Sequence, residues 1–197
     1  MRRVLSLLVL LIGGIGVFTS QSLFAERMQV SASDQVNLIQ KILKQDRTIA
    51  KQSDGVITIG LVYFTGDSRL VEAEKTEIIN AFHNLDGQTI KGKKITSVEI
   101  KFDNMGSFQQ ECASKNVDIL YIMPAEKTKV RPITQYTAQQ KILTITGMID
   151  HMTQWVSIAV SKAGDSNKIF LNLEQSKTEG ASFPANFLKI TQMVSPN

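Results

Sequence analysis

Asp150 and His151 are the residues of this sequence whose types best suit acid–base chemistry, because a carboxylate beside an imidazole can orient a general base. Adjacency along the chain does not create that geometry, and no Gly-x-Ser-x-Gly nucleophile motif accompanies the pair. The other histidine, His83, has no second His or Cys at a metal-ligand spacing. No predicted strand is followed by a phosphate-binding glycine run. The sequence therefore predicts no catalytic residue, no metal site and no cofactor.

A binding cleft has a stronger physical basis, because open α/β sheets bind ligands beyond the carboxyl ends of their strands. The residues expected near such an edge are Thr65, Gly66, Asp67, Ser68, Asp150, His151 and Trp155. The loop at Asp67 precedes a helix, so its free amides could hold an anion, or Asp67 could simply cap that helix. Trp155 either packs in the core or contacts a partner.

The elements that must position these residues follow from the hydrophobic pattern. Residues 56–63 are β-branched and apolar at nearly every position, which predicts a strand covered on both faces. Further strands are expected at 95–102, 118–123 and 142–146, with helices between them. This alternation predicts an α/β fold with one largely parallel sheet flanked by helices.

The last third of the chain has a different pattern. Residues 156–161 and 168–173 are separated by a short turn, which predicts an antiparallel hairpin beside the parallel strands. Phe187, Leu188, Ile190 and Met193 then mark a closing helix. We expect helical turns within 133–140, whereas Lys127, Lys129 and Arg131 form one of the short basic clusters predicted to lie in loops.

The first 25 residues predict export. Arg2 and Arg3 precede an apolar run that ends near Phe18, as in a secretory signal peptide. The run is shorter than the roughly 20 residues of a spanning helix, so we favour cleavage after Ala25 over a retained anchor. The domain organisation expected is a signal peptide at 1–25 and one domain at 26–197, with an ordered core at about 34–194.

Composition limits the classes of partner. Without the leader, 20 Lys and Arg remain against 18 Asp and Glu, which is nearly neutral. No basic stripe with interleaved aromatic residues is present, so we expect no nucleic-acid partner. Cys112 is the sole cysteine, which cannot close an internal disulfide; it is either a buried inert thiol or a reactive one.

The second half of the chain has a recognisable order of segments: 141–146, 156–160 and 168–173, then Asn172, a short helix at 175–179, Gly180 and an apolar end at 183–194. This order and wording resemble the YfiR-like family of small periplasmic proteins. The resemblance covers about 34–194 in layout. Members of the characterised branch use cysteine pairs, and redox control of that kind does not extend to this chain with Cys112 alone.

The resemblance implies a non-catalytic periplasmic regulator. The characterised branch binds the periplasmic sensor region of a membrane diguanylate cyclase and so modulates cyclic-di-GMP signalling. The expected partner is therefore the outer domain of an inner-membrane signalling protein. An alternative is a periplasmic small-molecule binding module that serves a transporter or receptor, with its ligand at the strand ends.

Overall fold

The computed structural model describes residues 28–64 and 69–195. The expected signal peptide and the loop Thr65, Gly66, Asp67 and Ser68 lie outside the described residues. The helices are α1 (Ala32–Gln45), α2 (Ile49–Gln52), α3 (Arg69–His83), α4 (Met105–Ser114), α5 (Lys127–Gln140), the 3-10 helix η1 (Ile149–Gln154), α6 (Leu173–Thr178) and α7 (Ala185–Leu188). The strands are β1 (Val56–Phe64), β2 (Thr89–Ile90), β3 (Lys93–Phe102), β4 (Ile119–Ile122), β5 (Leu143–Thr146), β6 (Ile158–Ala163), β7 (Ser166–Leu171) and β8 (Gln192–Met193).

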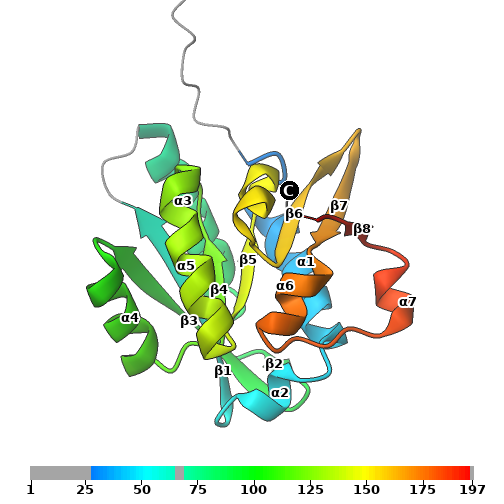
Figure 1. Ribbon diagram of the computed structural model, residues 1–197, viewed down its shortest axis with the longest axis horizontal. Coiled ribbons are helices and arrows are strands. Elements are labelled where there is room, and N and C mark those ends of the chain that lie inside the picture. The colour runs from blue at the N-terminus through cyan, green and yellow to red at the C-terminus, as the bar shows by residue number, and fades with distance from the viewer. Residues whose placement is uncertain (1–27, 65–68, 196–197) are drawn as a thin grey trace, which may run out of the picture.

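The strands form one sheet in the order β2-β3-β1-β4-β5-β6-β7-β8. The five strands from β3 to β6 are parallel, while β2 and β7 run antiparallel to their inner neighbours. Helices cover both faces of the sheet (Figure 1). The predicted α/β class, the central position of β1 and the C-terminal hairpin β6–β7 are therefore confirmed.

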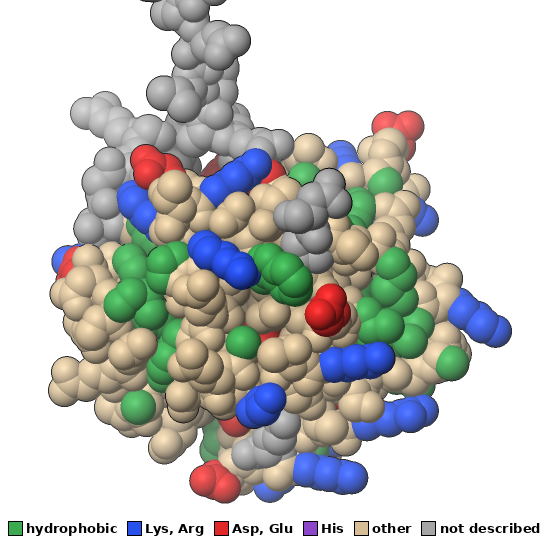
Figure 2. Space-filling model, viewed as in Figure 1, with side chains coloured by type: hydrophobic (Ala, Val, Ile, Leu, Met, Phe, Trp, Pro, Cys, Tyr) green, Lys and Arg blue, Asp and Glu red, His purple; other side chains and the backbone are tan. Residues whose placement is uncertain are grey.

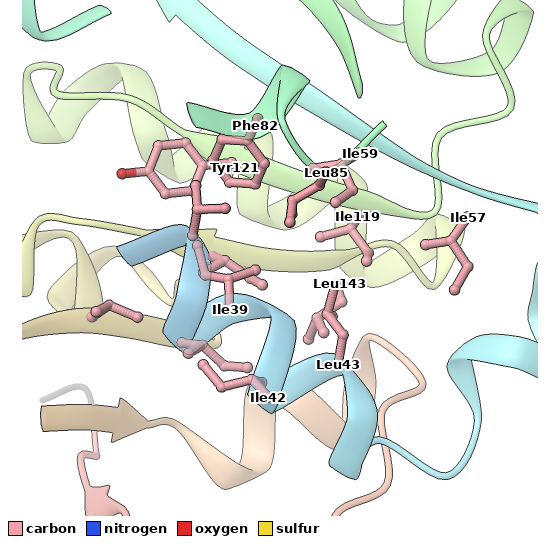
Figure 3. Packing of buried hydrophobic residues seen from close by; sticks show 14 of the residues in the cluster. Ile39, Ile42, Leu43, Ile57, Ile59, Phe82, Leu85, Ile119, Tyr121 and Leu143 are labelled. Carbon is pink, nitrogen blue, oxygen red and sulfur yellow. The ribbon is translucent and has the colours of Figure 1, made fainter. Parts of the chain in front are cut away.

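Two apolar layers hold the helices on the sheet. On one face, Ile39, Ile42 and Leu43 of α1 belong to one buried cluster with Ile119 and Leu143 of the sheet (Figure 3). Alternate residues of the same strands point to the other face, where they pack against α4, α5 and η1. Both layers exist because strand side chains alternate between the two sides of a sheet.

Helix α1 is capped at its start and is fixed by a buried polar contact. Ser31 accepts a hydrogen bond from the Asp34 amide at 3.2 Å, which caps the helix. Within the core, the Tyr121 hydroxyl donates to Gln35 Oε1 at 2.5 Å. Gly147 passes so close that a Cβ there would lie 2.5 Å from Gln35 Oε1. A glycine is needed at this strand end because the two polar side chains occupy the space.

Two segments differ from the sequence expectation. Lys127, Lys129 and Arg131 belong to α5 and not to a loop, although Pro132 lies inside that helix. Buried Val130 and Ile133 anchor this part of α5 to the sheet, and that tertiary packing outweighs the loss of one proline amide donor. The closing helix is only four residues long, and Gln192–Met193 then pair with β7 as β8.

Candidate functional site

His151 is used by the fold itself. Its side chain is fully buried, with Nδ1 3.1 Å from Thr146 Oγ1 and Nε2 3.0 Å from the Ala125 carbonyl. Burial lowers the pKa of His151, so the neutral ring with a proton on Nε2 donates to that carbonyl. The histidine therefore joins the loops that follow β4 and β5, and its ring nitrogens are not available to an external substrate.

Asp150 forms no hydrogen bond with His151 and pairs with a lysine instead. Its Oδ2 lies 3.5 Å from Lys127 Nζ in a partly exposed ion pair, which contributes little to stability. Its other oxygen, Oδ1, is buried without a hydrogen bond to any described residue. No group of three or more His, Cys, Asp or Glu that could hold a metal ion occurs in the described part of the chain. His83 is exposed at the end of α3, remote in sequence from both.

Trp155 lies at the other end of η1 and faces α5. Its backbone is left-handed, with φ at 63° and ψ at 32°, and the Arg131 guanidinium lies 5.2 Å from the centre of its ring. The two residues line a hollow of about 550 Å³ together with Gln175 of α6. The structure thus places Asp150, His151 and Trp155 on one short helix but directs the last toward a separate pocket.

Sequence reasoning missed a buried acid beneath that pocket. Glu179 is 1% exposed and follows α6. Its Oε1 accepts from Thr137 Oγ1 at 2.8 Å and from Gln175 Nε2 at 3.0 Å. Its Oε2 accepts from the Thr144 amide at 2.8 Å and from the Ser157 hydroxyl. One carboxyl group therefore ties together α5, β5, α6 and the start of β6.

Burial raises the pKa of Glu179 to about 7, although the hydrogen bonds from Ser157, Gln175, Thr144 and Thr137 act in the opposite direction. The ordinary value is 4.5, so between these pH values the folded state binds a proton that the unfolded state releases. The contribution of this group to stability is therefore complete below about pH 4.5 and is lost as the pH rises through 7.

This titration predicts a pH dependence that a single substitution removes. The free energy of unfolding of the parent should fall by up to about 1.4 kcal/mol per pH unit between pH 5 and 7 as Glu179 titrates. Glu179→Gln cannot titrate, so the variant should not show this decrease. His151 acts in the opposite direction, since its lowered pKa favours the folded state as the pH rises, and it is present in both proteins. Urea denaturation of parent and variant at pH 5, 6 and 7 measures the difference. Parallel stability curves would contradict the assignment.

Several solved structures share the fold of this chain. A conserved domain protein from Vibrio cholerae is similar over 85% of this chain, at 14% identity and a TM-score of 0.58. A substrate binding protein with adhesive properties from Clostridium difficile, in its ligand-free, open form, has 13% identity over 85% of this chain and a TM-score of 0.54. The ABC domain from Streptococcus pneumonia, in complex with L-Trp, has 16% identity over 83% and a TM-score of 0.54.

These similarities establish a shared fold. This chain spans about three fifths of each of those proteins, namely 61%, 61% and 60% of their lengths. Among curated proteins, no relative matches the chain. The model of the YfiR/HmsC-like family matches residues 64–192, and the chain belongs to this family. The resemblance inferred from the sequence is thereby confirmed.

Family membership supports a periplasmic regulatory role in the broad sense. The matched segment runs from the end of β1 to β8 and so includes η1, α5 and α6. Within the described residues, no helix is long and apolar enough to cross a membrane. On the face drawn in Figure 2, basic side chains are separated by neutral and hydrophobic ones.

Proposed function

We propose that this chain is a non-catalytic periplasmic regulator that binds the periplasmic sensor region of an inner-membrane diguanylate cyclase and so modulates cyclic-di-GMP signalling. The observation that carries the proposal is the YfiR/HmsC-like match over residues 64–192. The use of His151 in the fold agrees with a non-catalytic role, since both ring nitrogens already contact protein groups. The proposed organisation is a leader at 1–25 followed by one exported domain.

The proposal predicts a change in signalling when the protein is lost. Deletion of the gene in its host should raise cellular cyclic-di-GMP, and the full-length chain should restore the lower level. A chain lacking residues 1–25 should not restore it, because it stays on the wrong side of the membrane. Extraction of the nucleotide and mass spectrometry measure the effect. An unchanged level in a deletion strain, where the parent strain demonstrably makes the protein, would defeat the proposal.

Export has its own test. Intact-mass measurement on a periplasmic extract should find a chain that begins at Glu26, because the leader has the charged and apolar regions that signal peptidase substrates share. A substitution of Arg2 and Arg3 by glutamate, which reverses the charge of the leader, should reduce the amount exported. A full-length species in the membrane fraction would show that the leader is an anchor.

A second candidate function is a small-molecule binding module that serves a transporter or receptor. The specific observation in its favour is the hollow of about 550 Å³ beside Arg131 and Trp155, which has the size of small-ligand sites. Genes for transporter subunits beside the gene of this chain would favour it, whereas a neighbouring gene for a membrane diguanylate cyclase would favour the regulator.

A further inference from the structure

The hollow beside Arg131 and Trp155 combines side chains from three separate segments. Arg131, Gln135 and Gln139 lie on α5, Trp155 follows η1, and Gln175 lies on α6. Figure 1 shows α5 and α6 on the same face of the sheet. Its volume of about 550 Å³ is within the range of sites that hold small ligands. Among the described residues, one arginine and several neutral amides line it, and no carboxylate does. We call it the Arg131–Trp155 pocket.

The position of Trp155 is not explained by packing. It is the residue that ends η1 in the left-handed region, with φ at 63°, where glycine is the least strained choice and a bulky side chain is unusual. Its neighbours Met152 and Val156 are buried in the apolar layer, but Trp155 is only half-buried and belongs to neither apolar layer. Lys141 ends α5 with the same left-handed backbone, so what distinguishes Trp155 is the contact of its ring with Arg131 at the rim of the pocket.

Arg131 has hydrogen-bonding capacity left. Its guanidinium lies over the Trp155 ring, 5.2 Å from the ring centre. Among the described residues the guanidinium forms no ion pair and no side-chain hydrogen bond; the hydrogen bond from Thr134 Oγ1, at 3.0 Å, goes to the Arg131 backbone carbonyl. The N–H groups at the edge of a guanidinium plane match the two oxygens of a carboxylate.

The charge of the lining selects among anions. Arg131 is the one cation that lines the pocket, so it can balance a single negative charge. A phosphate dianion bound there would have a second negative charge without a partner, whereas a single carboxylate carries only one negative charge. Gln135 and Gln139 add neutral donors and acceptors, and Trp155 provides an apolar wall for the rest of the ligand.

We propose that the Arg131–Trp155 pocket binds a carboxylate-bearing ligand, with the carboxylate on the Arg131 guanidinium and the adjoining apolar part against Trp155. The carboxylate belongs either to a small organic acid or to an acidic side chain of a bound protein segment; the chemistry of recognition is the same. This site does not depend on the proposed cyclase partner, so each can fail without the other.

Fluorescence offers a direct test, because Trp155 is the single tryptophan of the 197 residues. Butyrate, a monoanion with an apolar tail, should change the emission of the purified protein saturably at constant ionic strength, whereas inorganic phosphate and sodium chloride should not. The peptide acetyl-Ala-Glu-Ala-amide is compared with acetyl-Ala-Gln-Ala-amide in the same way. Saturation by butyrate alone identifies a free acid as the ligand, and saturation by the glutamate peptide alone identifies a protein-borne carboxylate; both results support the site.

Variants decide whether Arg131 is responsible. Arg131→Gln should weaken binding of the active probe at least about tenfold, as expected for loss of one charge-assisted pair. Lys129→Gln makes the same charge change on the same helix but outside the lining, and should bind as the parent does. Thermal melting of both variants confirms their fold. No saturable response to either carboxylate probe, an equal response to phosphate, or equal weakening by the two substitutions would each overturn the proposal.

Discussion

Ile59→Asp should abolish cooperative folding. Ile59 lies in the middle of β1 and is 0% exposed, between Ser97 of β3 and Ile119 of β4 in the sheet. A carboxylate there would lose its hydration without gaining a partner, and the apolar layer under α1 would lose one of its members (Figure 3). An unpaired buried charge belongs to the exceptional substitutions that cost more than roughly 4–5 kcal/mol. A loss of that size approaches the roughly 5–15 kcal/mol that stabilises a typical domain.

Val56→Asp is the matched control for this substitution. Val56 begins the same strand but is 40% exposed, so the same carboxylate keeps its water. We expect a loss of less than about 1 kcal/mol, the span of strand preference at a surface position. Circular dichroism during a thermal melt measures both variants. If Ile59→Asp melted within a few degrees of the parent, the central placement of β1 would be wrong.

After Ile59→Asp, Glu179→Ala should cause the largest loss of folding stability among these substitutions. The substitution removes the acceptor for the Thr144 amide and for side-chain donors of Thr137, Ser157 and Gln175, all of which are buried. Buried donors without acceptors cost about 1–3 kcal/mol each, and some of these groups can find water in the space that the side chain vacates. We expect a net loss of about 3 kcal/mol at pH 6, which lowers the melting temperature by about 10 °C.

Glu174→Ala provides the comparison for Glu179→Ala. Glu174 lies on α6 only five residues earlier, is exposed, and is not bound to the buried cluster. Its replacement should change stability by no more than about 0.5 kcal/mol. Differential scanning calorimetry at pH 6 resolves the two cases. Equal melting temperatures for the two variants would show that the carboxyl group does not hold α5, β5 and α6 together.

The strands were predictable because their residues carry the information locally. Residues 56–63 are apolar without alternation, and only a strand covered on both faces accommodates that pattern, which β1 confirms. The short turn between 161 and 168 similarly requires an antiparallel hairpin, which β6 and β7 form. The family resemblance followed from the same segments and is confirmed by the match over 64–192.

Helix α5 shows where local signals failed. Lys127, Lys129 and Arg131 predict a loop before residue 133, because charged residues favour solvent. The helix includes them because Val130 and Ile133 bury their side chains against the sheet, a contact that the local sequence does not show. For the same reason Arg131 could not be assigned to a site beforehand.

The sequence by itself determined the class of the fold, the covered strand at 56–63, the hairpin and the family, because each depends on periodicity and on residue types within short segments. The order of the strands in the sheet came from the tertiary structure. Only the tertiary structure decided what the polar residues do. It buried His151 between two loops, enclosed Glu179 among donors from four segments, and turned Trp155 toward Arg131. These roles depend on contacts between residues 20 to 42 positions apart, and burial sets the chemistry of each group only once those contacts exist.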